Sequence, residues 1–321
     1  RQYANLILKP QKILKITLPL ALGGFLVWYS LTIVSPEKLA AYFKNANYPW
    51  VLLGLIFGIL SHISRAYRWK FLLEPMGFKP KFVNSFLAVL VGYLVNLILP
   101  RAGEVSRAAI MANYEKVPFE KGFGTIVAER LADLLMLFLV ILIALFIQFD
   151  FIWNLLIKNF NPLKIIGTLF LLIVGIFVVY KIIKKSSSTF AFKIKSFLFG
   201  LKEGLTSIFK MQKKWAFIVH TFFIWLMYIA MFWATIPAVD GLEIPFGGVL
   251  IGFIAGGFSI AATNGGLGLY PIAVASALAL FGVDEVTGNA FGWIMWTAQT
   301  AMIVVFGGLS FLVLPIFNKV K

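Results

Sequence analysis

The chain of 321 residues contains no cysteine, and its two histidines, His62 and His220, lie far apart inside apolar runs. Disulfides, thiolate chemistry and cysteine-ligated metals are therefore excluded, and each histidine is best explained by a polar contact between helices. Charged residues make up only 13% of the chain, against about 25% in a soluble domain. Because 60% of the residues are hydrophobic, most of the surface has to face lipid. The composition indicates a polytopic integral membrane protein and not a soluble enzyme.

Acidic residues are scarce as well, since 13 Asp and Glu stand against 29 Lys and Arg, for a net charge of +16. In a soluble protein this excess would suggest nucleic acid. In a membrane protein it is typical of cytoplasmic loops beside anionic headgroups, so we expect no nucleic-acid partner. No G-x-x-x-x-G-K-[ST] motif occurs, and we expect no nucleotide, metal or other cofactor.

Six apolar runs are long enough to cross a hydrocarbon core, which takes about 20 residues in a helix. They cover residues 15–34, 49–70, 123–149, 163–183, 214–238 and 291–316. Two further regions, 82–113 and 246–282, are apolar but interrupted by Pro and Gly, which predicts a helix, a break and a returning helix in each. We therefore predict one transmembrane domain over 1–321, all-α and polytopic, with six spanning helices and two helical hairpins.

The distribution of Lys and Arg predicts the orientation. If each interrupted region enters and leaves the membrane on one side, 22 of the 29 basic residues lie on one face, together with both termini. An excess of Lys and Arg marks the cytoplasmic face. On that face, Phe and Leu alternate with Lys over 185–213, which predicts an amphipathic helix on the membrane surface. We expect a plasma membrane of the bacterial type, with both termini in the cytoplasm.

In this topology the two interrupted regions are re-entrant hairpins of opposite orientation. Region 82–113 opens from the cytoplasm, and region 246–282 opens from outside. We prefer re-entrant hairpins to full crossings because the returning leg of the first is short and charged, and non-helical backbone at membrane depth has to be covered by protein or a cavity. Opposed broken helices are typical of inverted-repeat transporters, in which the substrate binds at the breaks.

Ionisable side chains inside the membrane are costly and usually functional. Here they gather at the first break, with Asn96, Arg101, Glu104 and Arg107, and in the helix that begins near Phe123, with Glu129, Arg130 and Asp133. We interpret both groups as a polar chamber whose arginines bind an anion, most simply a lipid phosphate. The helix N-terminus after Gly103 is expected to add free backbone donors. The alternative is a buried ion-pair network that only holds the hairpin in place.

The second break contains Asn264, Gly265, Gly266 and Gly268. Two interpretations stay open. The glycines either allow close helix packing, or they let backbone donors approach the substrate and let a gate bend. Trp296 and Gln299 of the last helix are further candidates to line the same chamber.

Three motifs together are familiar: the run from Asn96 to Arg107 (NLILPRAGEVSR), Glu129-Arg130-x-x-Asp133, and Gly265-Gly266-Leu267-Gly268. They resemble the lysylphosphatidylglycerol synthase transmembrane-domain family, also called flippase-like membrane proteins, over nearly the whole chain. The resemblance implies a lipid-translocating module. Larger members carry a soluble aminoacyl-transferase domain; this chain ends at Lys321 without one, so synthesis of a modified lipid is not expected.

The chain departs from the family pattern at the second break. The family's glycine motif usually follows a proline and precedes an acid, whereas Asn264 and Tyr270 stand at those positions here. The lipid headgroup is therefore expected to differ from an aminoacylated one.

The leading hypothesis is a lipid flippase or transporter, and not an enzyme. Its partners would be membrane lipids, either a phospholipid or a polyprenyl-phosphate lipid, moved passively or with Glu104, Glu129 or Asp133 as proton carriers. The alternatives are an intramembrane enzyme that acts on lipid phosphates and a membrane scaffold. Homo-oligomerisation stays open.

Overall fold

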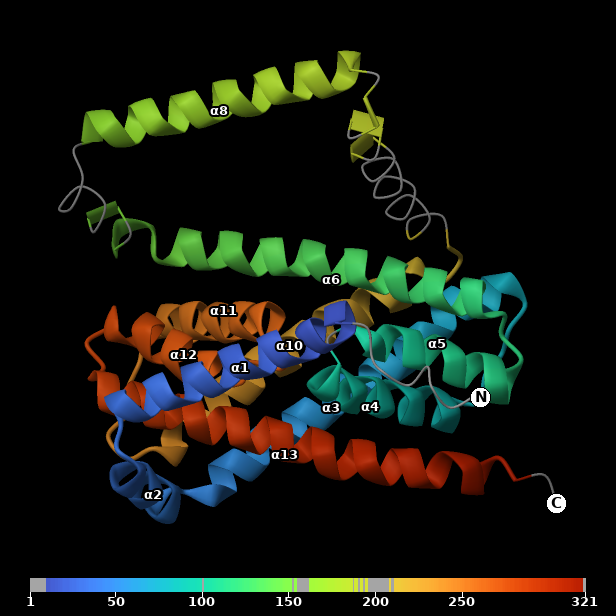
Figure 1. Cartoon of the computed structure of the whole chain (residues 1–321), viewed down its shortest axis with the longest axis horizontal. Coiled ribbons are helices and arrows are strands. Elements are labelled where there is room, and N and C mark those ends of the chain that lie inside the picture. Colours follow the sequence, from blue (N-terminus) through green and yellow to red (C-terminus); the bar gives the residue numbers. More distant parts are fainter. Residues whose placement is uncertain are drawn as a thin grey trace. The chain divides into compact units, whose positions relative to one another are not determined.

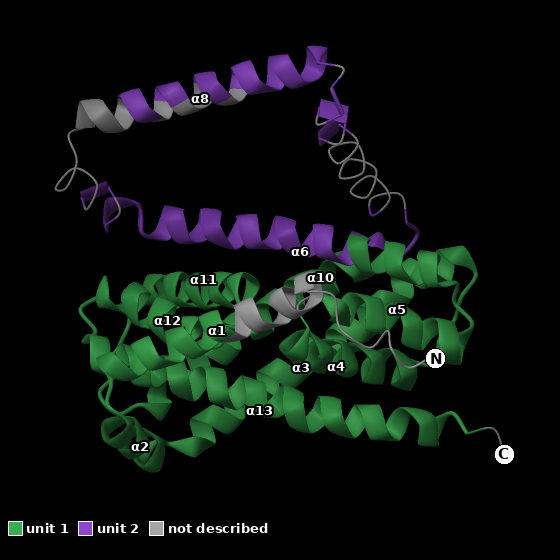
Figure 2. Cartoon of the chain, in the orientation of Figure 1, with its two compact units in different colours: residues 1–127, 215–321 green, residues 128–214 purple. Residues whose placement is uncertain are grey.

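The computed structural model describes residues 10–99, 101–151, 153–154, 162–186, 188–189, 191–192, 194–195, 208 and 211–319. Helices dominate these residues, and no strand occurs in the described part of the chain. The chain divides into two compact units, residues 1–127 with 215–321 and residues 128–214 (Figure 2). The prediction of an all-α protein is confirmed.

The first unit holds most of the helices (Figure 1). They are α1 (Pro10–Ile33), α2 (Pro36–Asn45), α3 (Tyr48–Leu73), α4 (Phe82–Ile98), α5 (Ala102–Glu115), the start of α6 (Phe119–Ile147), nearly all of α10 (Lys214–Thr235), α11 (Phe246–Ala262), α12 (Leu269–Ala279) and α13 (Glu285–Phe317). Short 3-10 turns, Glu74–Met76 and Ile236–Ala238, extend α3 and α10.

Four helical stretches in the described residues are long and apolar enough to cross a membrane: Tyr48–Met76, Phe119–Ile147, Lys214–Ala238 and Glu285–Phe317. They correspond to four of the six predicted runs, and α1 and α8 (Pro162–Lys185) occupy the other two. The chain is therefore a multi-pass membrane protein.

Two features of the helices differ from the prediction. The predicted loop 35–48 contains α2, which starts because the Ser35 side chain accepts a hydrogen bond from the Lys38 amide and Pro36 takes the first helical position. Helix α13 begins six residues before the predicted run, since the Asp284 carboxylate caps it by accepting the Thr287 amide at 2.9 Å.

Both interrupted regions form the expected helix, break and helix, and they pack against opposite halves of α13. Hairpin one (α4–α5) lies along the C-terminal half, where a Cβ added at Gly307 would come within 2.9 Å of the Leu90 carbonyl oxygen. Helix α12 of hairpin two (α11–α12) lies along the N-terminal half, where a Cβ at Gly292 would come within 2.6 Å of the Pro271 Cα. The hairpins therefore approach α13 from its two opposite ends.

The tips of the hairpins meet beside the middle of α13. A Cβ added at Gly265 would lie 2.6 Å from Cδ2 of Leu97, near the end of α4. The indole nitrogen of Trp296 on α13 donates a hydrogen bond to the Gly265 carbonyl at 2.7 Å. Helix α1 covers the same tip, since a Cβ at Gly268 would lie 2.5 Å from the Val27 amide nitrogen.

The second unit contains the rest of α6 and the helix α8. The amphipathic helix predicted over 185–213 lies largely outside the described residues.

Candidate polar site at the hairpin breaks

Arg101 forms the turn of hairpin one. It lies between α4 and α5 with a left-handed backbone, φ 63°, and its side chain is exposed. A left-handed conformation costs a residue other than glycine about 1–2 kcal/mol. Strained residues cluster at functional positions. Here the strained residue is an arginine, so the tip of the hairpin carries a guanidinium group.

Asn96 closes the break from the α4 side. Its side-chain oxygen accepts the Gly103 amide at 2.7 Å, and its amide nitrogen donates to Oε2 of Glu104 at 3.5 Å. The helix N-terminus after Gly103 was expected to offer free donors to an anion. Two amides of the first turn are already used, since the Gly103 amide donates to Asn96 and the Ala102 amide donates to the Leu99 carbonyl at 3.1 Å. Anion binding by the amides after Gly103 stays a prediction.

Glycine at position 103 is required by the close approach of the two helices. A Cβ there would lie 2.0 Å from the carbonyl oxygen of Gly92 on α4. Real Cβ atoms are not found so near a backbone oxygen, so a larger residue would push α5 away from α4. This contact sets the distance between the two polar legs of hairpin one.

Arg107, one turn after Glu104, is buried, with 3% of its surface exposed. Its guanidinium carbon lies 4.2 Å from the ring centroid of Trp69 on α3. The Trp69 indole in turn donates to the Thr125 hydroxyl at 2.8 Å. The aromatic face stabilises the buried cation, which lies in the second turn of α5, six residues after Arg101.

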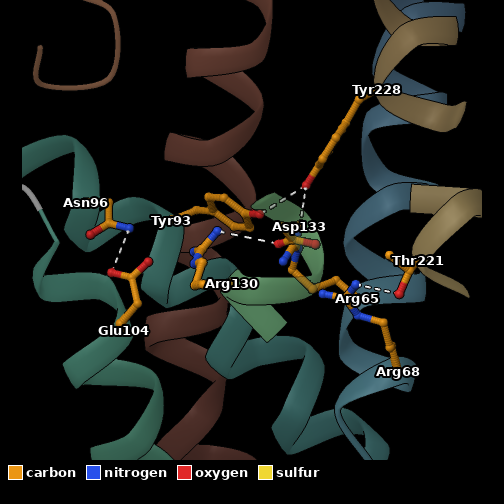
Figure 3. A network of polar contacts seen from close by, with 9 residues as sticks. All are labelled: Arg65, Arg68, Tyr93, Asn96, Glu104, Arg130, Asp133, Thr221 and Tyr228. Carbon is orange, nitrogen blue, oxygen red and sulfur yellow. Dashed lines mark hydrogen bonds and ion pairs between the residues drawn. The ribbon is translucent and has the colours of Figure 1, made fainter. Parts of the chain in front are cut away.

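Two further buried arginines, Arg65 and Arg68 of α3, were not predicted as site residues, although they stand near the end of the predicted run 49–70. They are 2% and 0% exposed. Arg65 donates from Nη2 to the Tyr228 hydroxyl at 3.1 Å, and Arg68 donates from Nη1 to the Thr221 hydroxyl at 2.8 Å. The Tyr228 hydroxyl also lies 3.1 Å from that of Tyr93 on α4 (Figure 3).

A sequence signal for these arginines does exist. Ser61, Ser64, Arg65 and Arg68 follow the spacing of one helix face, and all four are buried. Both histidines make contacts beside these arginines, His220 with this face and His62 from a neighbouring face of α3. The His220 Nδ1 lies 2.8 Å from the Ser64 hydroxyl, and the His62 ring centroid lies 4.5 Å from that of Tyr93.

The acidic motif of α6 lies in the second unit. Glu129 and Asp133 are 1% and 9% exposed. Nη1 of Arg130 lies 3.8 Å from Oδ2 of Asp133, and 41% of the Arg130 side chain is exposed. Within this motif, the two acids are therefore buried and the arginine is the half-exposed member.

The break of hairpin two is built from backbone. Gly265, Gly266 and Gly268 have φ values of 63°, 83° and 71°, which glycine adopts without the Cβ penalty. The Asn264 carbonyl accepts the Leu267 amide at 3.3 Å. Tyr270, which stands in place of the family's acid, is buried against Gly256. Trp296 reaches this break through its bond to Gly265.

The polar groups of the first unit are mainly arginines and hydroxyl-bearing side chains. Within the described ranges, no group of three or more His, Asp or Glu side chains that could hold a metal ion is found. Buried guanidinium and phenol groups instead supply donors that match the oxygens of a phosphate.

Comparison with known proteins places this geometry in context. The family model described as "Lysylphosphatidylglycerol synthase TM region" matches residues 16–308, which confirms the resemblance drawn from the motifs. The UPF0104 membrane protein MJ1595 of Methanocaldococcus jannaschii is 25% identical, covering 93% of this chain and 86% of that protein. The glycosyltransferase AglD of Haloferax volcanii is 25% identical over 103 residues, covering 32% of this chain and 16% of that protein. No solved structure matches.

Proposed function

Since the chain belongs to the lysylphosphatidylglycerol synthase transmembrane-region family, we propose that it moves a phosphate-bearing lipid between the leaflets of a membrane without changing it chemically. The substrate is a phospholipid or a polyprenyl-phosphate lipid. The membrane is a plasma membrane of the bacterial type, both termini are cytoplasmic, and the hairpins are re-entrant from opposite sides.

The observation that carries this proposal is the meeting of the hairpin tips beside buried arginines. Helix α13 has 33 residues and is therefore about 50 Å long. Because the tips meet beside its middle, a helix that spans the bilayer would place them deep in the membrane. Arg107 is nearly two turns of α5 from the tip. Arg65 is joined through Tyr228 to Tyr93, one turn before Leu97. Buried cations at such depth usually mark a substrate pathway.

The side chains suggest distinct tasks in this pathway. The exposed Arg101 at the tip would meet the phosphate first, and Arg107 and Arg65 would stabilise it further in by charge-assisted hydrogen bonds. Glu104 orients the first break through Asn96. Glu129 and Asp133 are the candidates for proton coupling, with Glu104 as a third.

The test is leaflet exchange of labelled phospholipid in liposomes containing the purified protein. We choose Arg101→Ala, at the tip, and Arg130→Ala, which removes the ion pair of Asp133, a proposed proton carrier. Both side chains are exposed or half-exposed, so the variants should fold. Loss of a charge-assisted hydrogen bond, about 1.5–3 kcal/mol, should slow exchange about tenfold or more. Lys79→Ala, at an exposed position outside the breaks, should leave exchange unchanged.

Normal lipid exchange in both arginine variants would contradict the proposed site. Chromatography of the recovered lipid covers the enzymatic alternative. Lipid that exchanges between leaflets and is recovered unchanged supports transport, whereas a new lipid product that depends on the protein contradicts it.

A further inference from the structure

A groove that the transport proposal does not use lies between hairpin one and the C-terminal part of α13. Its volume is about 330 Å³, and its walls are apolar apart from two hydroxyl-bearing side chains. The main contributors are Val91 and Val95 of α4, Ala109 and Ile110 of α5, and Phe311 and Leu314 of α13. The hydroxyl of Ser106, which also lines the groove, is already bonded to the Gly103 carbonyl. The groove therefore offers a hydrocarbon surface and few free polar groups.

The groove borders an exposed apolar surface of α13. Phe311 itself is 64% exposed, and the neighbouring Leu312 and Ile316 are 62% and 64% exposed. A row of large exposed apolar side chains on a membrane helix faces acyl chains. A hydrocarbon chain could therefore enter the groove directly from the bilayer.

One end of the groove carries a polar cap and a basic rim. The Asn84 amide donates to both the Glu115 carboxylate and the Asn318 side chain, so the start of α4 and the ends of α5 and α13 converge there. Each of these three residues has an exposed lysine within three positions along the chain: Lys81, Lys116 and Lys319. Glu115 is the only acid in this cap, so the rim keeps a net positive charge.

We propose that this groove binds an anionic phospholipid, with one acyl chain against α4, α5 and α13 and the phosphate at the lysine rim. Hydrocarbon walls beside a cluster of cations complement an anionic lipid, and each lysine near an anionic headgroup adds about fivefold to the affinity. The site rests on the proposed membrane orientation, but it does not depend on transport. It is separate from the arginines of the breaks.

The test uses the full chain in nanodiscs and a phosphatidylglycerol that carries a photoactivatable diazirine on one acyl chain. Peptide mass spectrometry locates the labelled residues. In one variant, Ala109→Trp fills the groove; in its matched control, Ala301→Trp places the same side chain at an exposed position of α13 outside the groove. A second variant, Lys81→Ala with Lys319→Ala, removes charge from the rim and leaves the walls intact.

We expect labelling of α5 and the end of α13 in the wild type and in the Ala301 control. Labelling should be lost in the Ala109 variant, and it should fall at least tenfold in the double lysine variant. Phosphatidylcholine with the same diazirine chain should label the groove at least tenfold less than the anionic probe.

Three outcomes would overturn the proposal: labelling that persists when the groove is filled, equal labelling by the two headgroups, or cross-links from α5 to a second copy of the chain in place of lipid. Leaflet exchange is measured separately in the same variants. A protein that labels as expected but moves no lipid would refute transport and leave this site in place.

Discussion

Hairpin one and hairpin two both turn beside the middle of α13, but their breaks are built from different residues. In hairpin one, the Asn96 side chain caps α5, and the strained residue is an arginine. In hairpin two, three left-handed glycines make the turn, and the side chain that holds it, Trp296, comes from α13. The first break is held by its own hairpin, and the second is held by its neighbours.

This difference separates two tasks. Hairpin one keeps its geometry through internal contacts, so it can present charged groups such as Arg101 and Glu104 at fixed positions. Hairpin two has few polar side chains at its break and fits closely against α1 and the end of α4. The stability of hairpin two should therefore depend mainly on packing. The stability and activity of hairpin one should depend more on polar and charged side chains.

The largest effect should come from Gly268→Ala, which tests the packing of hairpin two. The substitution adds left-handed strain, φ 71°, and an overlap with the backbone of α1 at 2.5 Å. Strain and overpacking together should cost about 2–5 kcal/mol. Tryptophan fluorescence during thermal unfolding in detergent measures the loss. Gly282→Ala has similar strain, φ 84°, but no neighbour within 4 Å, so an equal loss in both variants would rule out the contact with α1 as the cause.

The corresponding change in hairpin one is Gly103→Ala. It causes no left-handed strain, but its Cβ would overlap the Gly92 carbonyl oxygen, and we expect a loss of about 1–3 kcal/mol. Gly122→Ala, whose nearest neighbour would be 3.7 Å away, is the control in the same unfolding measurement. A loss at Gly103 no greater than at Gly122 would mean that α4 and α5 can separate freely, contrary to the close contact described above.

Much of this comparison could be predicted from the sequence, because both breaks carry local signals. The Pro100-Arg101 step and the glycines from Gly265 onward marked the turns, and apolar runs located the spanning helices. Three glycines of the second break, Gly265, Gly266 and Gly268, adopt the left-handed conformation that glycine permits.

The buried arginines of α3 show why the rest could not be predicted. Arg65 and Arg68 stand near the end of an apolar run, where basic residues usually belong to a cytoplasmic loop. Their spacing with Ser61 and Ser64 on one face of α3 is a weak signal. The partners Tyr228 and Thr221, more than 150 positions away along the chain, hold them inside the fold. The cap of Gly103 by Asn96 was missed for a related reason, since it depends on how the hairpin closes.

That cap provides a smaller test of hairpin one. Asn96→Ala removes the acceptor of the Gly103 amide and should lower the free energy of unfolding by about 1–2 kcal/mol. Asn96→Asp keeps an acceptor, so its stability should stay nearer the wild type, although its carboxylate would face Glu104. If both variants unfold like the wild type, the amide is satisfied in another way and hairpin one is not held by its own side chains.

The smallest expected effect is at the far end of α13, where Asp284 caps the helix beside the end of hairpin two. Hydrogen bonds from the side chain and then the backbone of Thr287 lower the pKa of Asp284 below its ordinary value of 3.8. A carboxyl group with a lower pKa in the folded state stabilises the fold above its unfolded pKa, and this stabilisation is lost as the pH falls through the folded pKa.

Asp284→Ala should therefore cost about 1 kcal/mol of unfolding free energy near neutral pH, and the difference from wild type should shrink as the pH is lowered to about 3. Asp284→Asn keeps an acceptor without a titrating group, so its difference from the Ala variant should not change with pH. A wild-type advantage that is constant from neutral to acidic pH would show that the charge of Asp284 does not contribute to the cap.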